Sequence, residues 1–194
     1  DYNEQIRKET FDKITKGALK VFAKYGFYGT TIKKITEASG LSYGLVYHYF
    51  PSKEQVFIYL VEEALQLSQG VIDRAVGIAG SPWEKLESLA RTLLHESLSG
   101  DSTLYFHILL QALTQGNEFP ELQNEIALYS SRLYETIIPI VIAGQADGSV
   151  VDGDPVGLTA AFLSLVQGLA IFSRSADAEQ SPVTPDILLN VLKK

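Results

Sequence analysis

Residues 30–54 read TTIKKITEASGLSYGLVYHYFPSKE, and this stretch decides the fold. Thr31 precedes a short amphipathic segment that stops at Gly40, as expected for a helix capped by a hydroxyl and ended by glycine. Ser42 can cap a second short helix, which Pro51 ends because the residue before a proline disfavours the helical conformation. Two short helices joined by a glycine-containing turn form the helix-turn-helix pattern, whose second helix enters the major groove of DNA.

The same string resembles the DNA-binding signature of the TetR family of bacterial repressors. The resemblance includes Gly26 and Phe27 upstream and the closing motif YHYFPSKE at residues 47–54. It implies an all-α protein with an N-terminal three-helix DNA-binding domain over residues 1–52. A larger helical domain for ligand binding and dimerisation is expected over residues 53–194. The implied partners are a second copy of the chain and a palindromic, double-stranded operator, because a two-fold dimer matches a two-fold site.

The second short helix has a face that can meet DNA. Tyr43 and Tyr47 are four positions apart and share one side of the helix, and Gly44 and His48 are related in the same way. Tyrosine and histidine can bond to phosphates or base edges, leucine can touch a thymine methyl, and glycine lets the backbone approach closely. By analogy with the family, the expected DNA contacts are Thr31, Lys33, Ser42, Tyr43, Gly44, Leu45, Tyr47, His48 and Lys53.

The rest of the chain predicts helices and no sheet. A first helix over residues 6–25 has apolar side chains at spacings of three and four, and Gly26 is expected to end it. Ser52 can cap a long fourth helix that joins the two domains without a flexible linker. Later helices are expected at residues 82–98, 102–114, 120–144, 155–174 and 185–192, several of them starting at proline.

Charge is divided unequally along the chain. The net charge of the 194 residues is −7. Residues 1–55 carry nine Lys and Arg against six Asp and Glu, a net +3, whereas residues 56–194 carry seven against seventeen, a net −10. This asymmetry is typical of a DNA-facing head on an acidic body.

Composition argues against several other classes of protein. The chain has no cysteine, and its three histidines, His48, His95 and His107, are isolated, so neither a metal site nor thiol chemistry is expected. No apolar run reaches the ~20 residues of a membrane span. The first ten residues are polar rather than basic and then apolar, so we expect a cytoplasmic protein with no membrane partner. Without a nucleophile motif or a phosphate loop, we expect no catalytic residues and no cofactor.

The C-terminal half is interpreted from the resemblance. It implies that the last two long helices, at 155–174 and 185–192, pair two chains through their apolar stripes. It also implies a cavity for a small, largely apolar effector among the helices before them, although the same residues would serve as ordinary core. The candidate lining residues are Trp83, Leu94, Phe106, His107, Leu110, Tyr129, Leu133 and Tyr134, with Leu86, Leu93, Leu113 and Ile137 as further candidates.

Three functions remain open from the sequence. The first is a DNA-binding transcriptional regulator, most simply a repressor, released from its operator when a small lipophilic or aromatic effector tilts the fourth helix. The second keeps DNA binding but makes the C-terminal domain only a scaffold for dimerisation or protein docking. The third is an enzyme that uses His95 with Glu87 or Glu96, which the lack of a nucleophile or metal motif disfavours.

Overall fold

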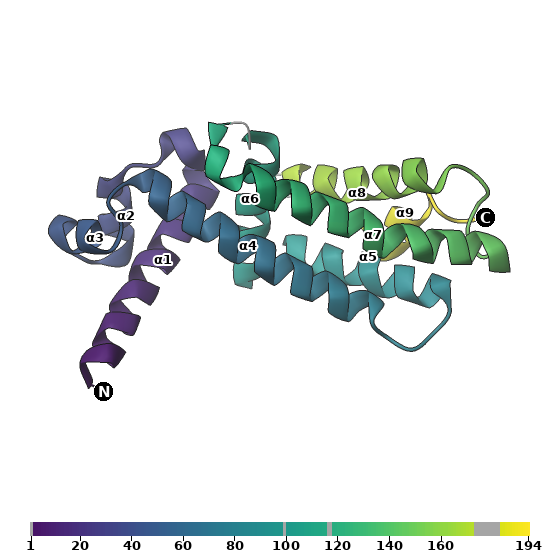
Figure 1. The fold of residues 1–194 in the computed structure, drawn as a ribbon, viewed down its shortest axis with the longest axis horizontal. Coiled ribbons are helices and arrows are strands. Elements are labelled where there is room, and N and C mark those ends of the chain that lie inside the picture. The colour runs from purple at the N-terminus through teal and green to yellow at the C-terminus, as the bar shows by residue number, and fades with distance from the viewer. Residues whose placement is uncertain (1, 99, 116–117, 173–182) are drawn as a thin grey trace.

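The structure is a computed structural model that describes residues 2–98, 100–115, 118–172 and 183–194. Within these ranges the regular elements are helices, apart from one isolated antiparallel bridge between Val150 and Lys193 (Figure 1). The expected all-α class is therefore confirmed. The helices are α1 (Tyr2–Gly29), α2 (Ile32–Ser39), α3 (Tyr43–Tyr49), α4 (Lys53–Val76), α5 (Pro82–Leu98), α6 (Gly100–Gln115), the short 3-10 helix η2 (Pro120–Leu122), α7 (Gln123–Asp147), α8 (Pro155–Phe172) and α9 (Pro185–Leu189).

Helices α1 to α3 form a small head at one end of the molecule, and α4 runs from this head into a body made of α5 to α9 (Figure 1). Thr31, Ser42 and Ser52 each accept a hydrogen bond from the backbone N–H three residues later, over 3.2, 3.3 and 3.3 Å. Gly40 ends α2 in the left-handed conformation, with φ 67°, which favours glycine. The starts of α2, α3 and α4 predicted from the sequence are therefore confirmed.

The first helix differs from its prediction at its C-terminal end. Gly26 has φ 70° and ψ 177°, so regular helical geometry breaks where the sequence predicts, but a further turn continues to Gly29. Earlier in the same helix, Gly17 allows α1 to approach α2 closely. A Cβ at Gly17 would lie only 2.9 Å from the backbone nitrogen of Ser39. The angle between the two helices therefore depends on a residue without a side chain.

One continuous apolar core joins the head to the body. At its centre Phe57 of α4 is fully buried, with its ring centroid 5.2 Å from those of Phe22 and Phe27 of α1 and 5.0 Å from that of Phe119. Phe119 precedes η2 and also meets Phe27 edge to face at 4.8 Å. The first turns of α4 thus belong to the packing of the head as much as to that of the body.

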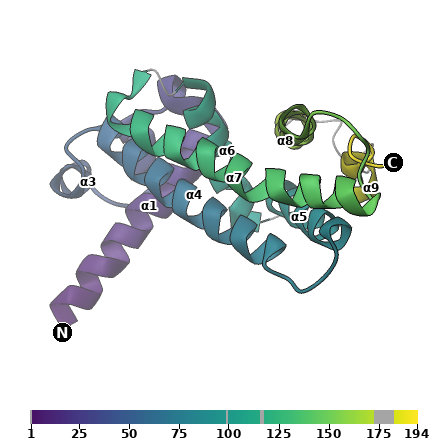
Figure 2. The same cartoon turned by 45° about the vertical axis from the view of Figure 1, so that its right-hand side comes forward.

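The C-terminal helices correct two predictions. The helix expected at 120–144 starts as η2 and continues as α7 to Asp147, three residues beyond the predicted end. The helix expected at 185–192 is only α9, five residues long. Its leucines Leu188 and Leu189 are buried within the protomer, where α9 lies against α5 (Figure 2). The last two residues of the segment expected at 155–174 fall outside the described residues.

By length and composition alone, the stretch Pro120–Asp147 is apolar enough to cross a membrane. One such stretch is weak support for a membrane protein, because the core helix of a globular protein passes the same test. Here Tyr129, Leu133 and Ile137 along this stretch are buried against other helices. Only 17% of the most apolar window is buried in this way, so one chain by itself covers a small part of the apolar surface of this stretch.

Candidate DNA-binding surface and effector pocket

Helix α3 presents an aromatic pair on the outer surface of the head. Of its seven residues only Val46 is buried, whereas Tyr43 and Tyr47 are 55% and 39% exposed. The hydroxyls of Tyr43 and Tyr47 share a hydrogen bond over 3.1 Å, and the ring centroids are 4.6 Å apart. This hydrogen bond is the main cause that raises the pKa of Tyr47 above its ordinary value. The raised pKa keeps the Tyr47 phenol protonated at neutral pH.

The residues next to Tyr43 and Tyr47 leave open space at the surface of α3. A Cβ at Gly44 would meet nothing within 4 Å, so no packing inside the protein requires glycine there. Leu45 and His48 are exposed on the same short helix, and the His48 ring lies 5.5 Å from the Tyr49 ring, edge to face. The structure thus gathers Ser42, Tyr43, Gly44, Leu45, Tyr47 and His48 on one exposed element, as the sequence predicts.

The residues predicted outside α3 divide into two groups. Thr31 and Lys33, at the start of α2, are exposed. Lys53 points inward instead. Its ammonium group donates hydrogen bonds to the backbone oxygens of Phe27 and Thr30 over 3.0 and 3.2 Å, and lies 4.4 Å from the centroid of the Phe27 ring. Lys53 therefore ties the start of α4 to the end of α1, and the predicted phosphate contact would compete with these bonds.

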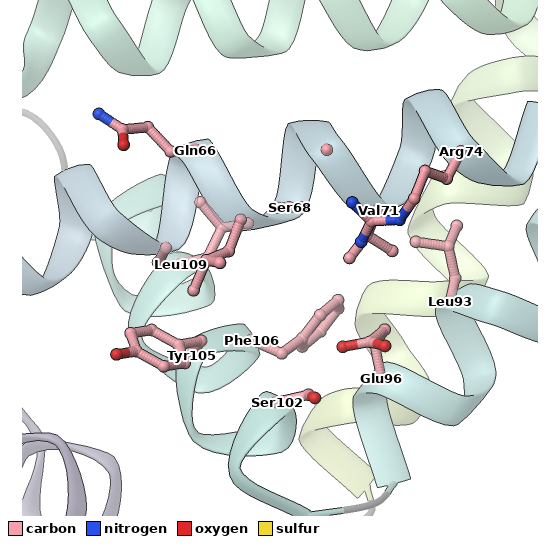
Figure 3. Close-up of a pocket in the computed structure, with 13 residues that line it drawn as sticks. Gln66, Ser68, Val71, Arg74, Leu93, Glu96, Ser102, Tyr105, Phe106 and Leu109 are labelled. Carbon is pink, nitrogen blue, oxygen red and sulfur yellow. The ribbon is translucent and has the colours of Figure 1, made fainter. Parts of the chain in front are cut away.

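A groove of about 420 Å³ opens between α4, α5 and α6 in the body (Figure 3). Its floor is apolar, and polar groups lie at its ends. Its lining includes Ser68, Val71 and Arg74 from α4, Leu93 and Glu96 from α5, and Tyr105, Phe106 and Leu109 from α6. An opening of this volume falls within the usual range for sites that hold small molecules.

A second, smaller cavity of about 40 Å³ adjoins the groove. The two share Ser68, Leu93, Phe106 and Leu109, so these residues form the boundary between them. At this boundary the hydroxyls of Ser68 and Tyr129 are 2.7 Å apart. Burial raises the pKa of the Tyr129 phenol, so the hydroxyl pair is neutral. The smaller cavity is otherwise lined mainly by aliphatic side chains.

Half of the predicted ligand residues border these openings. Phe106 lines both, while Leu110, Tyr129 and Leu133 line the smaller cavity, as do the further candidates Leu93, Leu113 and Ile137. Leu94, His107, Tyr134 and Trp83 line neither the groove nor the cavity. The Trp83 indole N–H donates to Glu87 over 2.9 Å, and Trp83 lines a separate surface pocket with Leu189 and Lys193. Glu87 is thus engaged away from Glu96, which lines the groove.

The sequence missed the charged residues of the groove. Arg74 and Glu96 stand outside the apolar stripes by which the lining was predicted, and neither belongs to a recognisable motif. Ser68 was missed because a lone serine in an amphipathic helix carries no local signal. Only the packing of three helices brings these polar groups to one opening.

The fold and the exposed α3 define a helix-turn-helix protein with a helical C-terminal body. A sequence model described as bacterial regulatory proteins, tetR family, matches residues 14–60. Over 172 residues the chain is 30% identical to the HTH-type transcriptional repressor NicS of Pseudomonas putida, an alignment that covers 88% of this chain and 78% of NicS. The chain therefore belongs to the TetR family of bacterial regulatory proteins.

Two further proteins are similar to this chain over very different shares of its length. The HTH-type transcriptional repressor AcnR of Corynebacterium efficiens is 34% identical over 65 residues, which are 33% of this chain and 35% of AcnR. The chain thus matches about a third of that protein's length. The crystal structure of AibR in complex with isovaleryl coenzyme A and operator DNA superimposes with a TM-score of 0.75 at 17% identity, over 92% of this chain and 93% of AibR. That likeness shows a shared fold.

Proposed function

We propose that this chain is a ligand-responsive transcriptional regulator, most simply a repressor, that binds operator DNA through α3 and releases it when a small effector occupies the groove. AibR supports the combination, because that protein of the same fold is described with both an acyl coenzyme A and operator DNA. The observation that carries the proposal is a set of contacts linking the groove to the head. A body used only as a scaffold has no need of such a link.

The link starts at Tyr105, in the wall of the groove. Its hydroxyl donates to one carboxylate oxygen of Glu63 over 2.7 Å, and the Tyr59 hydroxyl donates to the other over 3.4 Å. The Tyr59 ring then meets that of Phe11 edge to face at 5.0 Å, and its centroid lies 5.9 Å from that of Phe50, which follows α3. An effector that displaces Tyr105 therefore changes the support on which α1 and α3 rest.

A second link joins α6 directly to α1. The Gln111 side chain donates to the backbone oxygen of Phe22 over 3.1 Å. Leu109 and Phe106 of the groove are on the same helix, two and five residues earlier, so a shift of α6 reaches the head without an intermediate element. The domain boundary at residue 52 stays a prediction. The apolar core is continuous across this position.

Filling the groove with a side chain tests the switch without knowledge of the effector. Val71→Trp places an indole where the effector would lie, and we expect it to weaken binding to an operator selected from random DNA by the wild-type protein. The expected loss is ~5–150-fold, the usual range of allosteric coupling. Fluorescence anisotropy with labelled operator measures it, and Ile78→Trp, on an exposed loop residue, is the matched control.

The same variant tests the link. Tyr105→Phe removes the hydroxyl that bonds to Glu63 but keeps the ring, so by itself it should weaken operator binding as Val71→Trp does. The double variant should lose less affinity than the sum of the two separate losses, because both changes act on the same link. A folded Val71→Trp protein that binds operator like the wild type would show that the groove does not control the head.

The proposed regulator acts as a homodimer that pairs through α7 and α8. The prediction that residues 185–192 supply the second helix of the interface is unsupported, because Leu188, Leu189 and Leu192 are already buried inside the protomer. Large apolar side chains remain exposed on α7 and α8 instead, namely Leu128, Ile142, Val156, Leu165 and Ile171. Such exposed apolar side chains along two adjacent helices suit a symmetric four-helix interface.

Light scattering checks the dimer. We expect a mass twice the 21.3 kDa of one chain, and a shift towards the single-chain mass for Leu165→Glu, which puts a charge into the proposed interface. A wild-type chain that is monomeric at micromolar concentration would rule out this arrangement.

A further inference from the structure

Two opposite charges lie at one end of the groove. Arg74 of α4 and Glu96 of α5 line the same opening, with Leu93 between them (Figure 3). Among the residues that the structure describes, the one ion pair within 4.0 Å joins Lys194 and Asp152. Arg74 and Glu96 therefore do not neutralise each other, although both face the same space.

The remainder of the groove is suited to an apolar group. Val71, Phe106 and Leu109 form the part next to the charged end (Figure 3). Beyond Phe106 lies the smaller cavity of about 40 Å³. Because one water molecule occupies about 30 Å³ in the liquid, this cavity adds room for a small chemical group. The groove therefore fits a molecule with a dipolar head and a short apolar body.

We propose that the effector is an apolar α-amino acid, or a close analogue, whose carboxylate binds Arg74 and whose ammonium group binds Glu96. This assignment rests on the function proposed above. A guanidinium group binds a carboxylate through paired hydrogen bonds, and a carboxylate is the matching acceptor for ammonium. A plain carboxylic acid would place its charge near Glu96 without compensation, and a plain amine would do the same near Arg74. A zwitterion matches both groups at once, whereas a singly charged compound leaves one of them to water.

A charge series on one carbon skeleton tests the assignment. Isothermal titration calorimetry on the full chain compares phenylalanine, 3-phenylpropanoate and 2-phenylethylamine, and leucine with 4-methylpentanoate and 3-methylbutylamine. In at least one series we expect the amino acid to bind ~10-fold or more tightly than either singly charged analogue, as one charge-assisted hydrogen bond allows. If in both series the amino acid binds no better than its analogues, the assignment is wrong.

The roles of Arg74 and Glu96 can then be tested separately. Arg74→Gln should weaken binding of the amino acid by ~10-fold and remove any binding of the acid, whereas the amine should bind more tightly because a like charge is gone. Glu96→Gln should weaken binding of the amino acid and of the amine, whereas the acid should bind more tightly. Arg91→Gln is the matched control, because Arg91 is an exposed α5 arginine outside the groove. Equal effects of both variants on all three compounds would overturn the assigned roles.

Operator-binding measurements on the same proteins distinguish a failure of the amino-acid site from a failure of the proposed switch. An amino acid that binds with the expected charge dependence but leaves operator affinity unchanged supports the site and overturns the proposed switch. A neutral or singly charged compound that releases operator, while no amino acid binds, overturns the site and leaves the switch standing.

Discussion

Gly44→Leu is expected to leave the free protein at least as stable as the wild type and to weaken operator binding by ~10–100-fold. The site is open, because a Cβ there meets nothing within 4 Å. Exchanging glycine for leucine inside a helix favours the helix by up to ~1 kcal/mol. The added side chain would instead occupy the space between α3 and the DNA backbone, where the loss of one or two contacts costs ~1–3 kcal/mol each.

Thermal unfolding and fluorescence anisotropy together measure this opposite effect on stability and binding. Ala79→Leu adds a similar side chain at an exposed position in the loop after α4 and should change neither quantity. If Gly44→Leu binds operator with wild-type affinity, α3 does not approach the DNA through the side that carries Gly44.

Phe57→Ala is expected to lower the free energy of unfolding by ~3–5 kcal/mol, the largest effect on stability that we predict. Phe57 is fully buried and packs between Phe22, Phe27 and Phe119. Its removal leaves a cavity that the surrounding rings cannot fill without moving, because they belong to α1 and to the segment before η2. The cost therefore includes both the lost burial and the cavity.

Urea denaturation followed by circular dichroism measures this loss, with Ile78→Ala at a surface position as the control. A cost below ~1 kcal/mol would mean that the aromatic cluster does not join the head to the body. A separate early transition of the head in Phe57→Ala would support the view that α4 couples the two parts through this residue.

The candidate DNA-binding surface could be predicted from sequence because its determinants are local. Side chains four positions apart on a helix face the same side, so the pairing of Tyr43 with Tyr47 follows from their spacing alone. The same holds for the caps Thr31, Ser42 and Ser52, each of which bonds to an amide three residues later. Lys53 was the exception, since its acceptor on Phe27 lies 26 positions away.

The groove that we propose for the effector could be predicted only in part. The family resemblance gave Phe106, Leu110, Tyr129 and Leu133 as lining candidates, but it could not distinguish them from Leu94 and His107, which are buried without bordering either opening. Periodicity predicts which face of a helix is buried. Whether a buried side chain borders a void depends on the helices packed against it.

Residues 30–54 alone determine the helix-turn-helix, its caps and the exposed aromatic face of α3. Helix starts, turns and helix faces depend on neighbours within one or two turns. Three properties needed the folded chain: the inward bonds of Lys53, the burial of the α9 leucines inside the protomer, and the opposed charges of Arg74 and Glu96 in one groove. Each depends on side chains from different helices, whose distances are set by tertiary packing and not by their spacing along the chain.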